Sequence, residues 1–237
     1  MTGLSTPEIA ARRDAVLSRV DRAAERARRD PGGVSLLAVT KTHSAEVVRR
    51  AALAGMTLFG ENRVAEGVGK IQAVSGEFPG LEWRLIGPLQ TNKAKPALQY
   101  FSVIESLDRE RLATRLEGLA AELKRRVPVL LEVNLGGEET KSGAPPAEAE
   151  TLAALLLTLP HLELRGLMAV PPFTPDPEGA RPYFRRLKEI RNRLADRFGR
   201  PLPELSMGMS HDFEVAVEEG STEVRIGTAL FGERTGA

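Results

Sequence analysis

The sequence predicts an α/β fold, a (β/α)8 or TIM barrel with an extra helix at its N-terminus. Strand and helix signals alternate eight times along 237 residues, which is about the length of one such barrel. No change in composition marks a boundary, so we expect a single domain over residues 1–237, with residues 1–30 forming a helix packed on the barrel. A doubly wound open sheet is the structural alternative, and the count of eight strands favours the barrel.

The first 30 residues have the pattern of an amphipathic helix. Thr6 can cap it, Pro7 suits its first turn, and Ile9, Val16 and Val20 lie on one face. The stretch lacks the continuous apolar core of a secretory signal, and no run approaches the roughly 18 apolar residues that a membrane helix needs. We therefore expect a cytoplasmic protein with no membrane partner.

Charge and cysteine content exclude several classes of function. The 33 basic and 32 acidic side chains give a formal net charge of +1, which offers no reason to expect a nucleic-acid partner. The basic run at residues 185–193 has apolar residues at helical spacing, and we interpret it as the solvated face of an amphipathic helix. With no cysteine, the chain has no disulfide, thiolate metal site or cysteine nucleophile.

Eight strands are expected from the pattern of apolar residues between turn signals. They are expected at residues 36–39, 56–59, 83–86, 101–105, 127–133, 162–170, 205–207 and 223–226. The clearest helices between them are expected at residues 45–54, 108–125 and 146–159. The active face of such a barrel is built from the loops after the strands. Polar and glycine-containing stretches follow the strands here, at residues 60–63, 134–137, 208–212 and 227–228.

One lysine lies where the first predicted strand ends. Residues 36–39 are uninterruptedly apolar, which indicates a strand buried on both faces, and Lys41 shares a face with Leu37 and Val39. If this face lines the barrel, the amine lies at the top of an apolar interior, where burial favours its neutral form. Such a lysine can be a Schiff-base nucleophile. The alternative is a strand-end lysine that extends into solvent.

The last two loops carry the residue types of a phosphate site. Ser210 follows the seventh strand and Thr228 follows the eighth, and both can donate a hydroxyl group. Gly208 and Gly227 allow the backbone to approach a ligand closely. Both hydroxyl residues can equally be plain helix caps.

Arg225 is expected to project into the barrel because it alternates with the apolar Val224 and Ile226. A buried arginine needs a partner, which is either an inward carboxylate such as Glu132 or a ring nitrogen of a cofactor. A lysine, a phosphate site and an arginine together suggest pyridoxal 5′-phosphate (PLP). In that case Lys41 forms the imine, the last two loops hold the phosphate and the arginine meets the ring nitrogen.

The sequence resembles the pyridoxal-phosphate homeostasis protein family, whose barrels are similar to the N-terminal domain of alanine racemase. The resemblance runs in order over nearly the whole chain. It is carried by residues 38–41, 59–63, 86–93, 132–134, 141–143, 166–168, 207–212 and 225–232. It implies an alanine racemase N-terminal-domain-like PLP barrel.

The resemblance also implies a cofactor carrier that stores or transfers PLP, rather than an established enzyme. Seven positions match the family's cofactor-binding residues, and these are Lys41, Asn62, Met168, Ser210, Arg225, Gly227 and Thr228. The resemblance places the Schiff base on Lys41, the phosphate at the last two loops, Arg225 at the pyridine nitrogen, and Asn62 and Met168 beside the ring. An arginine at that nitrogen disfavours its protonation and weakens the electron sink, which suits storage better than carbanion chemistry.

Two features separate this chain from its relatives. The family commonly has Trp-His before its Ile-Gly-x-Leu-Gln stretch, whereas Trp83 is followed here by Arg84, so no role of that histidine transfers. Alanine racemases add a β-domain with a tyrosine base, while this chain ends soon after the eighth strand and has only Tyr100 and Tyr183, outside the strand-end loops. We expect a monomer without catalytic residues, with PLP-dependent apoenzymes as its partners. The alternative is a weak PLP-dependent racemase or decarboxylase.

Rival functions find less support in the residues. The pair His211-Asp212 is superficially like a metal-binding motif, but only His43 and His161 accompany it, so we expect no metal site. Residues 67–70 lack the spacing of a phosphate loop, and residues 140–142 lack the glycine before the lysine.

Overall fold

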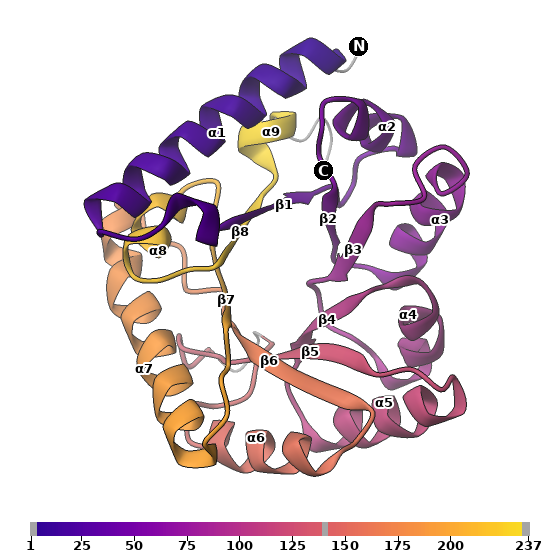
Figure 1. Cartoon of the computed structure of the whole chain (residues 1–237), viewed down its shortest axis with the longest axis vertical. Coiled ribbons are helices and arrows are strands. Elements are labelled where there is room, and N and C mark those ends of the chain that lie inside the picture. The colour runs from indigo at the N-terminus through magenta and orange to yellow at the C-terminus, as the bar shows by residue number, and fades with distance from the viewer. Residues whose placement is uncertain (1–3, 139–141, 234–237) are drawn as a thin grey trace.

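Parallel strands close into an eight-stranded barrel in the computed structural model, which describes residues 4–138 and 142–233. Each strand pairs with the next one along the chain, and the last pairs with the first. The helices form a ring on the outside (Figure 1). The (β/α)8 prediction is therefore confirmed, and the open sheet is wrong. Lys141, which helps to carry the resemblance, lies outside the described residues.

The strands are short, and their apolar residues pack against those of the helices in the core between barrel and helices. They are β1 (Ser35–Val39), β2 (Leu58–Glu61), β3 (Glu82–Leu85), β4 (Val103–Leu107), β5 (Val127–Glu132), β6 (Leu162–Met168), β7 (Glu204–Met209) and β8 (Glu223–Ile226). The helices are α1 (Thr6–Arg26), α2 (Ala45–Leu53), α3 (Val64–Val74), α4 (Ala94–Tyr100), α5 (Glu110–Glu122), α6 (Ala149–Thr158), α7 (Arg181–Phe198), α8 (Phe213–Glu218) and α9 (Thr228–Phe231). Short 3₁₀ turns are η1 (Pro31–Gly33), η2 (Thr91–Lys93) and η3 (Pro177–Ala180).

Two strands begin two residues later than the apolar runs predict. The N–H of Met56 donates to the carbonyl of Ala51, and the N–H of Phe101 donates to the carbonyl of Ala97. Both residues are buried, but they terminate the preceding helices rather than start β2 and β4. The shift places Glu61 within β2, at the edge of the predicted site.

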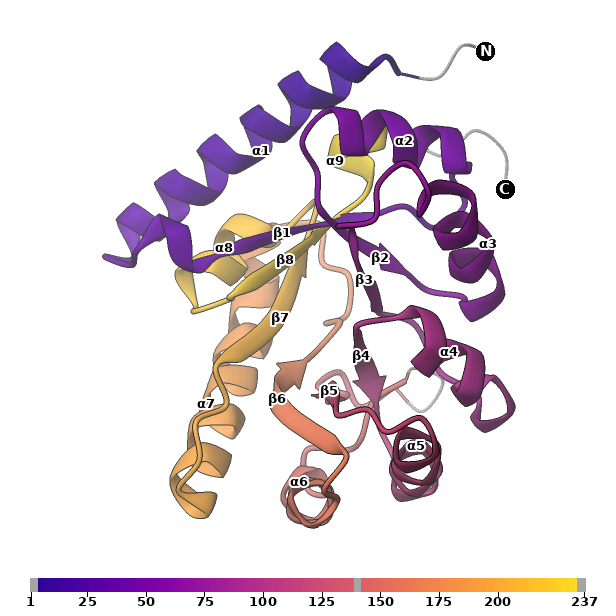
Figure 2. The ribbon, with the colours of Figure 1, turned by 45° about the vertical axis from the view of Figure 1, so that its right-hand side comes forward.

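The N-terminal helix α1 lies along the outside of the barrel, beside α8 and α9 (Figures 1 and 2). Its buried stripe includes Ile9, Val16 and Val20, as predicted. Its cap is Ser5 rather than Thr6, because the N–H of Ser5 donates to Glu8 Oε2 at 2.8 Å in a capping box. Among the helices of the described residues, none combines the length and apolarity needed to cross a bilayer.

Candidate cofactor site at the barrel mouth

A cavity of about 320 Å³ opens where the strands end. Six of the seven predicted cofactor-binding residues line it, and these are Lys41, Asn62, Ser210, Arg225, Gly227 and Thr228. The seventh, Met168, is fully buried at the end of β6 and does not line the cavity. Its place beside a cofactor ring stays a prediction. Residues from the two ends of the sequence thus meet in one cavity.

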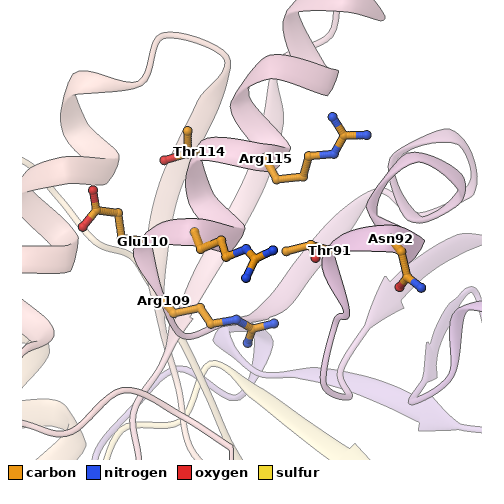
Figure 3. A pocket seen from close by; sticks show the side chains of 7 residues that line it. Thr91, Asn92, Arg109, Glu110, Thr114 and Arg115 are labelled. Atoms are coloured by element: carbon orange, nitrogen blue, oxygen red, sulfur yellow. The ribbon is translucent and has the colours of Figure 1, made fainter.

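A larger hollow of about 990 Å³ lies outside the barrel, between η2 and the start of α5 (Figure 3). Arg109 and Arg115 point to the side of Thr91, while Glu110 points away from it. The hollow is wide open, and Arg109, Glu110 and Arg115 are all exposed. We therefore place the candidate site in the smaller cavity, which is less open to solvent and is lined by the buried guanidinium of Arg225.

The turn that carries Lys41 is held in an unusual conformation from both sides. Thr42 has a φ of 69°, which is strained for a residue with a branched side chain. Its N–H donates to Glu66 Oε1 at 2.5 Å, and the carbonyl of Thr40 accepts from Lys70 Nζ at 2.6 Å. Helix α3 therefore fixes the backbone on each side of Lys41 and aims the lysine at the cavity.

Lys70 is the centre of a buried ion cluster that sequence reasoning missed. Its Nζ lies 2.7 Å from both Glu61 Oε1 and Glu66 Oε1, and the hydroxyl of Thr40 donates to the same Glu61 oxygen at 2.5 Å. Burial raises the pKa of Glu61 in spite of these contacts. Burial also acts to raise the pKa of Glu66, but the bonds from Lys70 and from the Thr42 N–H lower it overall. The spacing of Glu66 and Lys70 by four residues was the available signal.

Substituting Lys70 with methionine is expected to lower the free energy of unfolding by about 2 kcal/mol, because a buried carboxylate loses its partner. The loss stays moderate since Glu61 can take up a proton. Urea denaturation at neutral pH measures it. The exposed Lys95 serves as the control, and Lys95→Met should leave stability almost unchanged. Equal effects of the two substitutions would contradict this role of Lys70.

The opposite wall of the cavity gathers hydrogen-bond donors from the last two loops. The N–H groups of Gly227 and Ala229 donate to Ser210 Oγ at 3.3 and 3.2 Å. Ser210 thus caps the turn that starts α9, and it does not cap α8, the helix that follows it in the sequence. Gly208 has a φ of 94°, and a Cβ there would lie 2.5 Å from the Cβ of Ala216. Backbone N–H groups and two hydroxyls at one point form a donor set that suits a phosphate.

Arg225 projects from β8 into the barrel and is only 4% exposed. Its Nη1 donates to Ser206 Oγ at 2.7 Å, and its Nη2 donates to the carbonyl of Ala169 at 2.8 Å. Glu132, which was one predicted partner, forms no ion pair with it among the described residues. Burial raises the pKa of Glu132 overall, and the charge of Arg225 opposes part of that rise, so the two side chains interact at longer range. The guanidinium is therefore anchored through neutral oxygen atoms.

The cavity wall also has an acceptor without a partner. Asn62 Oδ1 is buried and accepts no hydrogen bond from the described residues. A Cβ on Gly87 would lie 2.3 Å from the backbone oxygen of Asn62, so only glycine fits behind it. An amine, a guanidinium, a donor set for phosphate and an unpaired acceptor together fit a phosphorylated heteroaromatic aldehyde such as PLP.

Two histidines at the cavity were not predicted as site residues. The ring of His43 packs on Phe231 at a centroid distance of 5.2 Å, and His211 Nε2 lies 3.0 Å from the carbonyl oxygen of Thr174. Their proximity in sequence to Lys41 and Ser210 was the only signal. Within the described residues, no group of three or more His, Cys, Asp or Glu side chains could hold a metal ion.

Comparisons with known proteins identify the family of this chain. The alanine racemase N-terminal domain family matches residues 12–235. The pyridoxal phosphate homeostasis protein of Aquifex aeolicus is 48% identical over 219 residues, which are 92% of this chain and 95% of that protein.

Two solved structures share the fold. An unknown protein from Bifidobacterium adolescentis is 38% identical, with a TM-score of 0.89 over 95% of each chain. PipY of Synechococcus elongatus, solved with PLP bound, is 37% identical, with a TM-score of 0.80 over 90% of this chain and 100% of that one. With these similarities over nearly its whole length, the chain belongs to the pyridoxal phosphate homeostasis protein family, within the alanine racemase N-terminal domain family.

Proposed function

We propose that this protein binds PLP at the barrel mouth as a Schiff base with Lys41 and serves in PLP homeostasis by storing or transferring the cofactor. The observation that carries the proposal is the meeting of Lys41, Arg225 and the donor set around Ser210 in one cavity. The PLP-bound state of the related PipY and the names of the curated relatives support it.

Each wall of the cavity has a role in this proposal. The amine of Lys41 adds to the cofactor aldehyde, one water leaves and a C=N bond forms. The phosphate is held by the hydroxyls of Ser210 and Thr228 and by the backbone at Gly227. Arg225 faces the ring nitrogen, and Asn62 lies beside the ring. When bound, PLP would supply an electrophilic aldehyde carbon, and hydrolysis of the C=N bond by one water would return the free amine of Lys41 and intact PLP.

A carrier fits these residues better than a weak racemase or decarboxylase does. Arg225 is positively charged and can only donate hydrogen bonds. It therefore disfavours a proton on the ring nitrogen of PLP and weakens the cofactor as an electron sink. Neither Tyr100 nor Tyr183 lines the cavity, and the hydroxyl of Tyr100 accepts from Gln72 Nε2 at 2.7 Å on the surface. We propose further that residues 1–237 act as one monomeric PLP-binding domain and that apoenzymes are its recipients.

The visible absorption spectrum of the purified protein with added PLP tests the proposal. The wild type is expected to show an aldimine band that borohydride abolishes by reduction, and Lys41→Ala is expected to lack it. Lys95→Ala, which changes an exposed lysine on α4, should keep the band. A wild-type protein without the band at excess PLP would overturn the proposal. Multiple-turnover racemisation or decarboxylation of L-amino acids, lost in Lys41→Ala, would favour the enzyme instead.

A further inference from the structure

A layer of charged side chains fills the barrel interior below the cofactor cavity, where such barrels usually hold branched apolar residues. Arg84 on β3 is 9% exposed. Its Nη1 lies 2.8 Å from Glu204 Oε2, 3.0 Å from Glu223 Oε2 and 3.6 Å from Glu105 Oε1. Glu105 and Glu223 are almost fully buried on β4 and β8. One arginine therefore joins carboxylates from three other strands.

Ser206 on β7 connects this layer to Arg225. Its Oγ lies 2.7 Å from Glu105 Oε2 and 3.0 Å from Glu223 Oε1, and it accepts from Arg225 Nη1 at 2.7 Å. A hydroxyl has one proton and can give it to only one of the two carboxyl groups. Burial, together with neighbouring Glu105, raises the pKa of Glu223 well above its ordinary value, which lets Glu223 supply the other proton.

The order of contacts is thus Arg84, then the carboxyl pair, then Ser206, then Arg225. We propose that Arg84 is a positioning residue that fixes the Arg225 guanidinium at the floor of the cavity through Glu105, Glu223 and Ser206. The inference rests on the proposed function in one respect, that Arg225 meets bound PLP. It gives a role to Arg84, which stands after Trp83 at the position where the family commonly has histidine.

This network differs from an ion cluster that only stabilises the fold, because it ends at the Arg225 guanidinium, which lines the cavity. Both Nη atoms of Arg225 are held by acceptors, Ser206 Oγ on one side and the carbonyl of Ala169 on the other. If Ser206 loses its hydroxyl, Nη1 loses its acceptor, and the guanidinium can rotate about one remaining anchor. Residues that align the ligands of a metal ion typically change affinity or activity by about 10–100-fold when they are removed, and we expect the lower end of that range here.

Ser206→Ala tests the connection with little change in volume. We expect PLP affinity to fall about tenfold, the absorption band to shift, and the Nε–H NMR signal of Arg225 in the protein without PLP to broaden. Ser221→Ala is the matched control, because Ser221 is also fully buried, but among the described residues its hydroxyl has only backbone carbonyls within hydrogen-bond distance, those of Leu205, Met207 and Glu223. It should leave all three readouts as in the wild type.

Arg84→Lys tests the far end of the network, since lysine keeps the charge but cannot span several carboxylates. A smaller loss of affinity is expected, and in the double variant with Ser206→Ala the two effects should not add. Unchanged affinity, band and Arg225 signal in Ser206→Ala would overturn the inference, even if its melting temperature falls. Additive effects in the double variant would overturn the part played by Arg84. Failure of the proposed function is distinct, because the wild type itself would then bind no PLP.

Discussion

Replacing Arg84 with glutamine is expected to lower the free energy of unfolding by about 3–5 kcal/mol, because it leaves buried carboxylates without their cation. Burial by itself lowers the pKa of Arg84, but Glu223, Glu105 and Glu204 together raise it above its ordinary value. The folded protein therefore holds this charge tightly. Glu105 is fully buried and has no access to water that could replace the guanidinium.

Urea denaturation of three further variants isolates this effect. Arg165→Gln removes an arginine that lies 2.8 Å from the same Glu204 but is 39% exposed, and it should cost less than about 1 kcal/mol. Arg84→Lys should retain much of the stability. Glu105→Gln added to Arg84→Gln should recover part of the loss, because the most buried carboxylate is then neutral. A loss for Arg84→Gln no larger than for Arg165→Gln would contradict the argument.

Most of the barrel could be predicted because its strands are buried apolar runs between turn residues. The late starts of β2 and β4 have one cause: a buried apolar residue that ends a helix has the same local pattern as one that starts a strand. Met56 and Phe101 illustrate this, since their N–H groups bond back to helix carbonyls. Only the path of the backbone distinguishes the two cases.

The site was predictable where its residues follow strands, because a barrel brings all strand ends to one rim. Five of the six predicted positions that line the cavity follow a strand in this way, and the sixth, Arg225, projects into the barrel from within β8. The residues that support them were not predictable, since their partners are distant in sequence. Arg84 and Glu204 are 120 residues apart, and Arg225 finds the carbonyl of Ala169 56 residues away. Their alternation places them inside the barrel, but no local pattern pairs them.

The second large effect concerns Glu132, whose carboxyl group lies near Arg225 and is 6% exposed. Burial first, then the charges of Asp108 and Glu105, raises its pKa from 4.5 to about 7, and Arg225 partly opposes this. In the unfolded chain the group loses its proton near pH 4.5. Between pH 4.5 and 7 the folded state therefore binds more protons than the unfolded state, and stability falls as the pH rises.

The stabilisation that comes from proton binding at Glu132 is fully present below pH 4.5 and is lost by about pH 7. The difference between those two pKa values corresponds to about 3 kcal/mol in the free energy of unfolding. In Glu132→Gln, the side chain is neutral at every pH, so the fall in stability across this interval should shrink by about that amount. Glu122→Gln, at an exposed position on α5, should retain the wild-type profile.

Chemical denaturation at a series of pH values measures both profiles. Identical slopes for wild type and Glu132→Gln between pH 4.5 and 7 would contradict a raised pKa at this site. The same experiment on Arg225→Gln checks the link between the two groups. Because Arg225 lowers the pKa of Glu132, its removal should raise that pKa further and move the loss of stability to higher pH. An unchanged or lower midpoint would mean that the arginine at the cavity floor does not act on Glu132.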